Sequence, residues 1–135
     1  MPEQPLPQRP RVLLADDHLA IVQRVTTLLE TTFEVIGTAR TGREMVAEAI
    51  RLKPDVIVVD ISMPEVGGIE AVHELRELGS KAKVVFLTIH SEDEFVNACF
   101  AEGALGYVAK THMGTDLIQA IRAALSGRPF ISLAR

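Results

Sequence analysis

The chain has 135 residues, 47% of them apolar, which is the size of one ordinary globular domain. Its 18 acidic and 14 basic residues give a formal net charge of −4, and no basic cluster stands out, which argues against nucleic-acid binding by this segment alone. The single cysteine, Cys99, excludes an intrachain disulfide, and no cysteine and histidine spacing resembles a zinc site. No apolar stretch approaches the roughly 20 residues of a membrane helix, so we expect a soluble protein of the reducing cytoplasm.

Residues 1–10 are rich in proline and polar side chains, and we expect a flexible leader there rather than a secretory signal. After them, short runs of valine, isoleucine and leucine alternate with longer stretches of helical period, which is typical of parallel strands joined by crossover helices. The expected strands are residues 11–16, 33–39, 55–61, 83–89 and 106–110. The sequence therefore predicts an α/β fold: a single (βα)5 doubly wound parallel sheet, flavodoxin-like, with strand order 2-1-3-4-5.

The five helices are predicted from apolar stripes that repeat every three to four residues and should face the sheet. Gly79, Gly103 and Gly127 stand where the third, fourth and fifth helices should end. In chain order the stripes are Ile21, Val22, Val25, Leu28 and Leu29; Met45, Val46, Ala49 and Ile50; Ile69, Val72 and Leu75; Phe95, Val96, Cys99 and Phe100; and Leu117, Ile118, Ile121 and Leu125.

Reactive side chains stand at the carboxyl ends of four expected strands. Asp16 and Asp17 end the first strand, Asp60 the third, Thr88 the fourth and Lys110 the fifth. Right-handed crossovers bring these ends to one edge of the sheet, and strands one and three are neighbours, so the three carboxylates should converge. Two unit charges about 4 Å apart repel by about 4 kcal/mol at an effective dielectric of about 20. Magnesium offsets this repulsion and keeps positions open for phosphate oxygens, so the pattern predicts phosphoryl transfer to a carboxylate.

Four segments together resemble the receiver domain of bacterial response regulators. They are ADDH at 15–18, VVDISMPEVGGIE at 58–70, FLTIH at 86–90 and GYVAK at 106–110. The resemblance covers residues 11–127, which we expect to form the receiver domain. It implies a phosphoacceptor switch of a two-component system, which assists its own phosphorylation and dephosphorylation and is not otherwise an enzyme.

The resemblance assigns a role to each site residue. It implies that Asp60 is phosphorylated by a histidine kinase. Asp17, Asp60 and the backbone carbonyl of Ser62 would ligate Mg²⁺, with Asp16 acting largely through water. Lys110 would pair with the phosphate.

The same resemblance implies a conformational switch. Thr88 would swing toward the phosphate, Tyr107 would follow from an outward to an inward rotamer, and the face of the fourth helix, fifth strand and fifth helix would change shape. That face would form a homodimer or meet a target. Residues 103–132 look like receivers of the NarL/FixJ group, which precede a LuxR-type DNA-binding domain. Residues 128–135 are then a tail or the start of a linker to such an output domain, through which alone DNA would be bound; the alternative is a receiver acting alone through protein contacts.

Several residues allow simpler interpretations. Asp16 and Asp17 taken alone fit helix N-caps, and Tyr107 fits a core strand position equally well. Ile89 follows the threonine where many receivers carry a small residue, so it should narrow the path to Asp60. The cysteine should be a packed core thiol. The histidines lack metal spacing and should lie on the surface, with His90 near enough to the phosphoacceptor to affect hydrolysis; they are His18, His73, His90 and His112.

Other functions share this fold class. A flavin-binding flavodoxin-like protein would need a phosphate loop after the first strand and aromatic side chains around the ring, whereas the chain has no tryptophan and one tyrosine. An aspartyl-phosphate phosphatase resembling the haloacid dehalogenases would carry an acid at the position of Ser62. A receiver that works without phosphorylation is least favoured, because all five site residues are present.

Overall fold

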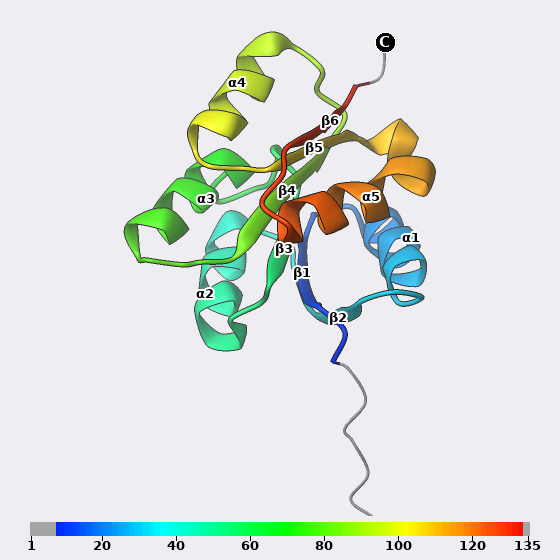
Figure 1. Cartoon of the computed structure of the whole chain (residues 1–135). Helices are drawn as coiled ribbons and strands as arrows, with labels where there is room; N and C mark the ends of the chain where they lie inside the picture. Colours follow the sequence, from blue (N-terminus) through cyan, green and yellow to red (C-terminus); the bar gives the residue numbers. More distant parts are fainter. Residues whose placement is uncertain (1–7, 134–135) are drawn as a thin grey trace, which may run out of the picture.

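The structure is a computed structural model and describes residues 8–133 (Figure 1). The predicted leader, residues 1–10, therefore lies largely outside the described residues. Strands and helices alternate as the sequence predicts. They are β1 Arg11–Ala15, α1 Leu19–Leu29, β2 Glu34–Ala39, α2 Gly42–Leu52, β3 Val56–Val59, α3 Gly68–Glu77, β4 Lys83–Thr88, α4 Asp93–Ala101, β5 Gly106–Ala109, the short 3-10 helix η1 Lys110–His112, α5 Met113–Leu125 and β6 Phe130–Ser132.

The sheet is parallel and has the order β2-β1-β3-β4-β5-β6. The predicted order 2-1-3-4-5 is confirmed, and β6 extends it beyond β5. We expected residues 128–135 to be a tail or linker, yet Phe130–Ser132 pairs with Gly106–Val108. Three residues carry no recognisable period, so the sequence gives no local signal for this strand.

Two layers of helices enclose the sheet: α1 and α5 cover one face, and α2, α3 and α4 cover the other (Figure 1). Successive strand residues point to opposite faces. Leu13 and Ile57 therefore join the core under α2, α3 and α4, while Leu14 and Val58 join the core under α1 and α5. Burial on both faces explains why the central strands are continuous apolar runs.

The predicted helix ends are also observed. Helices α3, α4 and α5 each end two residues before a glycine of positive φ, at Gly79, Gly103 and Gly127. One core prediction is wrong: Ile50 is 52% exposed, because it lies in the last turn of α2 at the rim of a surface cavity.

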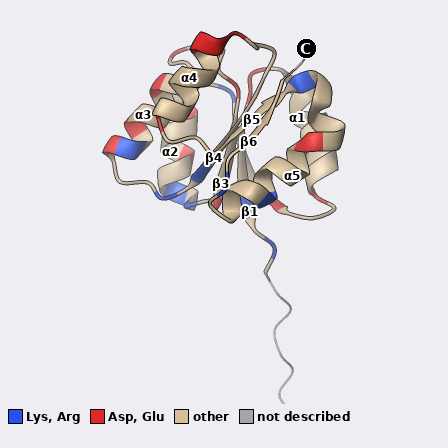
Figure 2. Cartoon of the chain, turned by 45° about the horizontal axis from the view of Figure 1, so that its top comes forward, with Lys and Arg blue, Asp and Glu red and all other residues tan. Residues whose placement is uncertain are grey.

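Charged residues of both signs are spread over the helices, and the first turn of α4, with Asp93 and Glu94, is acidic (Figure 2). Within residues 8–133, no helix has the length and apolar character needed to cross a membrane.

Candidate functional site

The strand register brings the predicted carboxylates together. Asp16 and Asp60 directly follow β1 and β3, whose last residues, Ala15 and Val59, are paired. The backbone amide of Asp60 donates to the Ala15 carbonyl at 2.9 Å, which fixes the two strand ends side by side. Thr88 is the last residue of β4, and Lys110 follows β5 directly.

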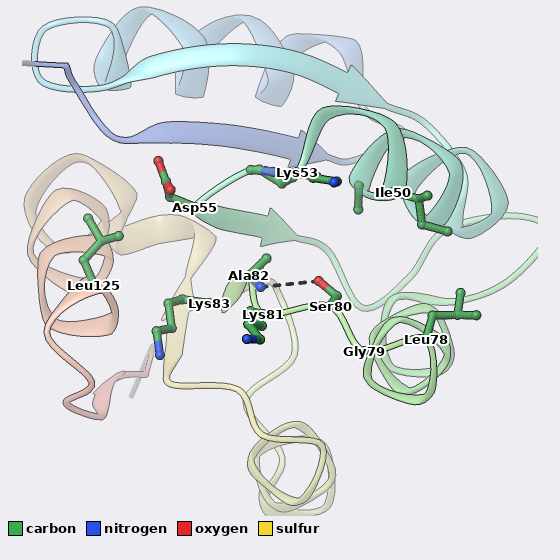
Figure 3. Close-up of a pocket in the computed structure, with 12 residues that line it drawn as sticks. Ile50, Lys53, Asp55, Leu78, Gly79, Ser80, Lys81, Ala82, Lys83 and Leu125 are labelled. Carbon is green, nitrogen blue, oxygen red and sulfur yellow. Dashed lines mark hydrogen bonds between the residues drawn. The ribbon is translucent and has the colours of Figure 1, made fainter.

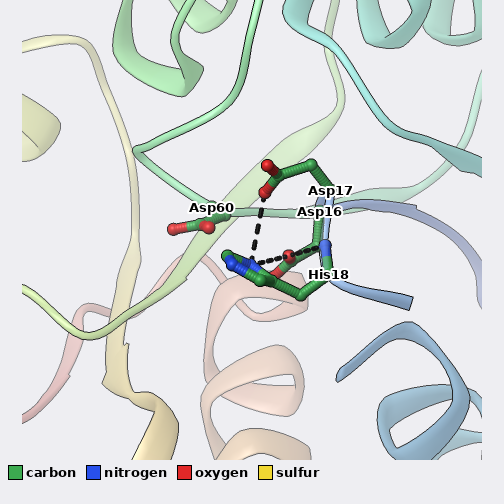
Figure 4. Close-up of side chains that lie close together, drawn as sticks. All are labelled: Asp16, Asp17, His18 and Asp60. Carbon is green, nitrogen blue, oxygen red and sulfur yellow. Dashed lines mark hydrogen bonds and ion pairs between the residues drawn. The ribbon is translucent and has the colours of Figure 1, made fainter. Parts of the chain in front are cut away.

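The acidic side chains form one cluster at this edge (Figure 4). Asp16, Asp17, His18 and Asp60 each offer a ligand atom, and these atoms all lie within 4.8 Å of one another. Asp16 and Asp60 are 1% and 3% exposed, whereas the Asp17 side chain is 33% exposed. Carboxylates this close and this buried need compensating positive charge.

Lys110 supplies part of that charge. Its ammonium lies 2.8 Å from Asp16 Oδ2 and 3.1 Å from Asp60 Oδ2. Burial alone would lower the pKa of Lys110, but the Asp16 and Asp60 carboxylates outweigh it and the pKa is raised. The pKa of Asp60 is raised as well, because burial and the Asp16 charge outweigh the help from Lys110 and the Ser62 amide. One ammonium is therefore too little for this set of carboxylates.

The donor set fits a hard divalent cation. Asp17 Oδ1 is buried and, among the described residues, accepts no hydrogen bond. The nearest cationic group is the His18 imidazole, whose Nδ1 lies 3.3 Å away and carries charge only when protonated. A buried carboxylate oxygen that accepts no hydrogen bond, beside two further carboxylates, is the environment that Mg²⁺ or Ca²⁺ ligands provide. Ser62, the remaining predicted ligand, donates its amide to Asp60 Oδ1 at 3.4 Å.

His90 connects the other predicted residues. Its backbone amide donates to Thr88 Oγ1 at 3.1 Å, and its carbonyl accepts from the Tyr107 hydroxyl at 2.8 Å. Its Nε2 lies 2.9 Å from Ser62 Oγ, and its ring stacks on Phe95 of α4 with centroids 4.5 Å apart. Tyr107 points inward and is fully buried, which raises its pKa. The loop after β4 thus joins the site to α4 and β5.

The loop between β3 and α3 closes tightly on the site. The Gly68 amide donates to the Ile61 carbonyl at 2.8 Å. A Cβ on Gly68 would lie 2.0 Å from the Asp60 carbonyl oxygen, so no larger residue fits there without movement. The Gly67-Gly68 pair therefore enters α3, as predicted, and lets that helix begin against Asp60.

Two cavities lie at opposite edges of the sheet. The one at the acidic cluster measures about 340 Å³ and is lined by Asp60, Ser62 and Lys110 together with Ile89, which is 75% exposed. The larger, about 550 Å³, lies where β3 and β4 begin (Figure 3). It holds none of the predicted site residues, so we assign the chemistry to the smaller one.

The capping interpretation is not supported. The N-caps of α1 and α3 are His18 and Gly67, so neither helix is capped by an aspartate. His18 lies on the surface as predicted, with its side chain 62% exposed, and its Nδ1 in addition lies 3.1 Å from Asp16 Oδ1. Its position directly after the two aspartates was the available signal. Cys99 is buried as expected, and burial raises its pKa to about 12.

A doubly wound parallel sheet with an acidic pocket and a buried lysine at its carboxyl edge defines a class of α/β signalling domains. The family model of the response regulator receiver domain matches residues 12–122. The chain belongs to this family, and the predicted resemblance is confirmed. Receivers are signalling switches rather than conventional enzymes.

Named relatives agree with this assignment. Response regulator GacA of Pseudomonas viridiflava is 37% identical over 124 residues, which cover 90% of this chain and 58% of GacA. Transcriptional regulatory protein LiaR of Bacillus subtilis is 42% identical over 122 residues, covering 88% of this chain and 57% of LiaR. The crystal structure of a LuxR-family two-component response regulator from Aurantimonas sp. SI85-9A1 aligns with a TM-score of 0.86 at 32% identity, covering 91% and 89% of the two chains. The chain is thus related to LuxR-type regulators and spans somewhat more than half of these curated relatives.

Proposed function

We propose that this receiver accepts a phosphoryl group on Asp60 from the phosphohistidine of a histidine kinase, with Mg²⁺ bound by Asp16, Asp17 and Asp60. The observation that carries the proposal is the buried Asp60 carboxylate, which lies beside two more carboxylates and 3.1 Å from the Lys110 ammonium. A nucleophile in a charged pocket that opens to a cavity is suited to phosphoryl transfer, where positioning and charge neutralisation do most of the work.

The transfer requires no reactant other than the phosphohistidine and the Asp60 carboxylate. An Asp60 carboxylate oxygen forms a bond to phosphorus while the bond from phosphorus to the donor nitrogen breaks, and the electron pair leaves with the imidazole. Lys110 stands where it neutralises a phosphoryl oxygen, and Thr88 offers a hydroxyl that donates to another. Mg²⁺, when bound, neutralises charge on the phosphoryl oxygens and keeps the carboxylates ionised. The Ser62 carbonyl would complete its protein ligands.

The switch uses the contacts of His90. If the Thr88 hydroxyl turns to the phosphoryl group, it leaves the His90 amide, to which it is bonded at 3.1 Å. The loop that carries His90 also holds the Tyr107 hydroxyl and stacks on α4, so both elements respond to that change. We therefore propose that phosphorylation alters the α4–β5–α5 face, which forms a homodimer or meets a target.

The named relatives support a role in transcription. LiaR is named a transcriptional regulatory protein, and both curated relatives are longer than the matched region. We propose that this receiver controls a LuxR-type DNA-binding output domain, through which DNA is bound. A receiver acting alone through protein contacts is the alternative.

Acetyl phosphate as the phosphoryl donor tests the site directly. The chain is incubated with acetyl phosphate and Mg²⁺, and its intact mass is recorded. We expect the gain of one phosphoryl group, absent with a chelator and absent in Asp60→Asn. The matched control is Asp55→Asn, which changes an exposed aspartate at the opposite edge of the sheet and should retain the gain. A full mass gain in Asp60→Asn would overturn the proposal.

A further inference from the structure

Strand β6 occupies the edge of the sheet that β5 would otherwise expose. The pairing is parallel, with Gly106 opposite Phe130 and Val108 opposite Ser132. The Phe130 amide donates to the Leu105 carbonyl at 2.8 Å. A free strand edge is a template for pairing with another chain, and covering it removes that template.

The same segment packs on both sides of β5. Phe130 is partly buried against the core cluster that includes the buried residues of α5. Leu133 packs against the core cluster on the other face of the sheet, which includes Cys99 of α4. Residues 130–133 therefore lie across the α4–β5–α5 face. In Figure 1 the red strand β6 runs along β5 between α4 and α5. In this conformation the β5 edge is closed to a partner.

A side-chain clasp fixes β6 to the element that follows β5. Ser132 Oγ donates to Asp116 Oδ2 of α5 and lies 3.1 Å from His112 Nδ1. The His112 and Asp116 side chains are themselves 3.8 Å apart. Two side chains, His112 and Asp116, thus converge on the hydroxyl of Ser132, the last residue of β6.

The clasp is one short element away from the site. His112 is the last residue of η1, and Lys110 is the first. The Lys110 ammonium binds the Asp16 and Asp60 carboxylates. A phosphoryl group on Asp60 therefore changes the groups that the ammonium contacts. Lys110 and His112 belong to the same three-residue 3-10 turn, so a movement of the Lys110 backbone has only this one short element through which to reach His112.

We propose that β6 is a removable strand that competes for the β5 edge with a second copy of this chain, and that phosphorylation of Asp60 weakens its hold through η1. This inference rests on the proposed function and names what controls the α4–β5–α5 face. A second copy suits the edge, because a two-fold axis places identical strand edges against each other. β6 itself demonstrates that this edge accepts an extended segment.

Hydrogen exchange in the unaltered chain tests the coupling. The Phe130 amide is protected by its bond to Leu105, so we expect it to exchange at least tenfold faster when beryllofluoride and Mg²⁺ occupy the site. Occupancy is recorded separately by ¹⁹F NMR. An unchanged Phe130 rate in the fully occupied protein overturns the inference and leaves the proposed function intact.

A pair of proline variants tests the competition without any phosphoryl chemistry. Phe130→Pro removes the amide that bonds Leu105. Because alternate residues of a parallel strand bond to a given neighbour, the Ile131 amide points away from β5, and Ile131→Pro is the matched control. By sedimentation equilibrium on the unmodified chains, Phe130→Pro should dimerise with a Kd at least tenfold lower than Ile131→Pro. Equal dimerisation of the two folded variants overturns the inference whether or not Asp60 accepts phosphate.

Discussion

Lys110 should contribute more to stability than any ordinary surface lysine, although it sits at a functional site. Its side chain is 8% exposed, and its ammonium lies 2.8 and 3.1 Å from the carboxylates of two aspartate side chains that are 1% and 3% exposed. Removing one partner of a buried ion pair costs about 3–5 kcal/mol, because the other charge stays buried and unpaired. In Lys110→Met the Asp16 and Asp60 carboxylates lose the ammonium that contacts both of them, so we expect a loss of about 3 kcal/mol in the free energy of unfolding.

Asp60→Asn should change the free energy of unfolding in the opposite direction. It removes one of the crowded carboxylates, whose pKa is already raised by burial, so the variant should be more stable than the unaltered chain at neutral pH. The double variant Lys110→Met with Asp60→Asn should lose less than Lys110→Met alone. This difference measures the coupling between the two side chains.

Urea unfolding in a chelator at neutral pH measures these free energies without a bound cation. Lys83→Met is the control, because Lys83 is an exposed lysine of the same sheet and its loss should change stability by less than about 0.5 kcal/mol. If Lys110→Met matched Lys83→Met, the charge balance inferred for the site would be refuted.

Three further predictions follow from single contacts. Gly68→Ala should lower the unfolding free energy by more than about 2 kcal/mol, because its Cβ meets the Asp60 carbonyl, whereas Gly114→Ala in the first turn of α5, where a Cβ meets no atom within 4 Å, should not lower it; urea unfolding of both, with no such contrast, would contradict the close approach. A raised pKa means that folded Asp60 keeps its proton above the ordinary value of 3.8, so its contribution to stability falls as pH rises through that interval. The stability advantage of Asp60→Asn should accordingly grow as the pH rises above 3.8 in chelator and level off once folded Asp60 is ionised, and a constant advantage would exclude this origin. Ile89→Ala should speed phosphorylation by acetyl phosphate several-fold by widening the cavity at Asp60, and an unchanged initial rate would remove that role.

The convergence of the site residues was predictable, because the topology of a parallel sheet determines where the ends of its strands lie. Asp16, Asp60 and Lys110 are far apart in sequence, but each directly follows a buried strand, and right-handed crossovers put those strand ends at one edge. The sheet order was predicted from the doubly wound, flavodoxin-like fold class. No propensity argument was needed beyond the apolar runs.

The parts that escaped prediction depend on tertiary contacts with little sequence signal. Strand β6 is three residues long and is held by the free edge of β5 and by a clasp from His112 and Asp116, none of which its own residues reveal. The bonds of His90 to Thr88 and Tyr107 involve its backbone, and any residue type makes those. Ile50 shares a helical stripe with buried residues, but it lies at the rim of a surface cavity, whereas Ala49 and Leu52 of the same helix turn pack against the core.

The most direct measurement is to locate the modified residue. After treatment with acetyl phosphate and Mg²⁺, borohydride reduces an aspartyl phosphate to homoserine, which tandem mass spectrometry of peptides assigns to one position. We expect homoserine at position 60 and none at position 16 or 17. Homoserine at Asp16 or Asp17, or at no position in the acidic cluster, would contradict this expectation.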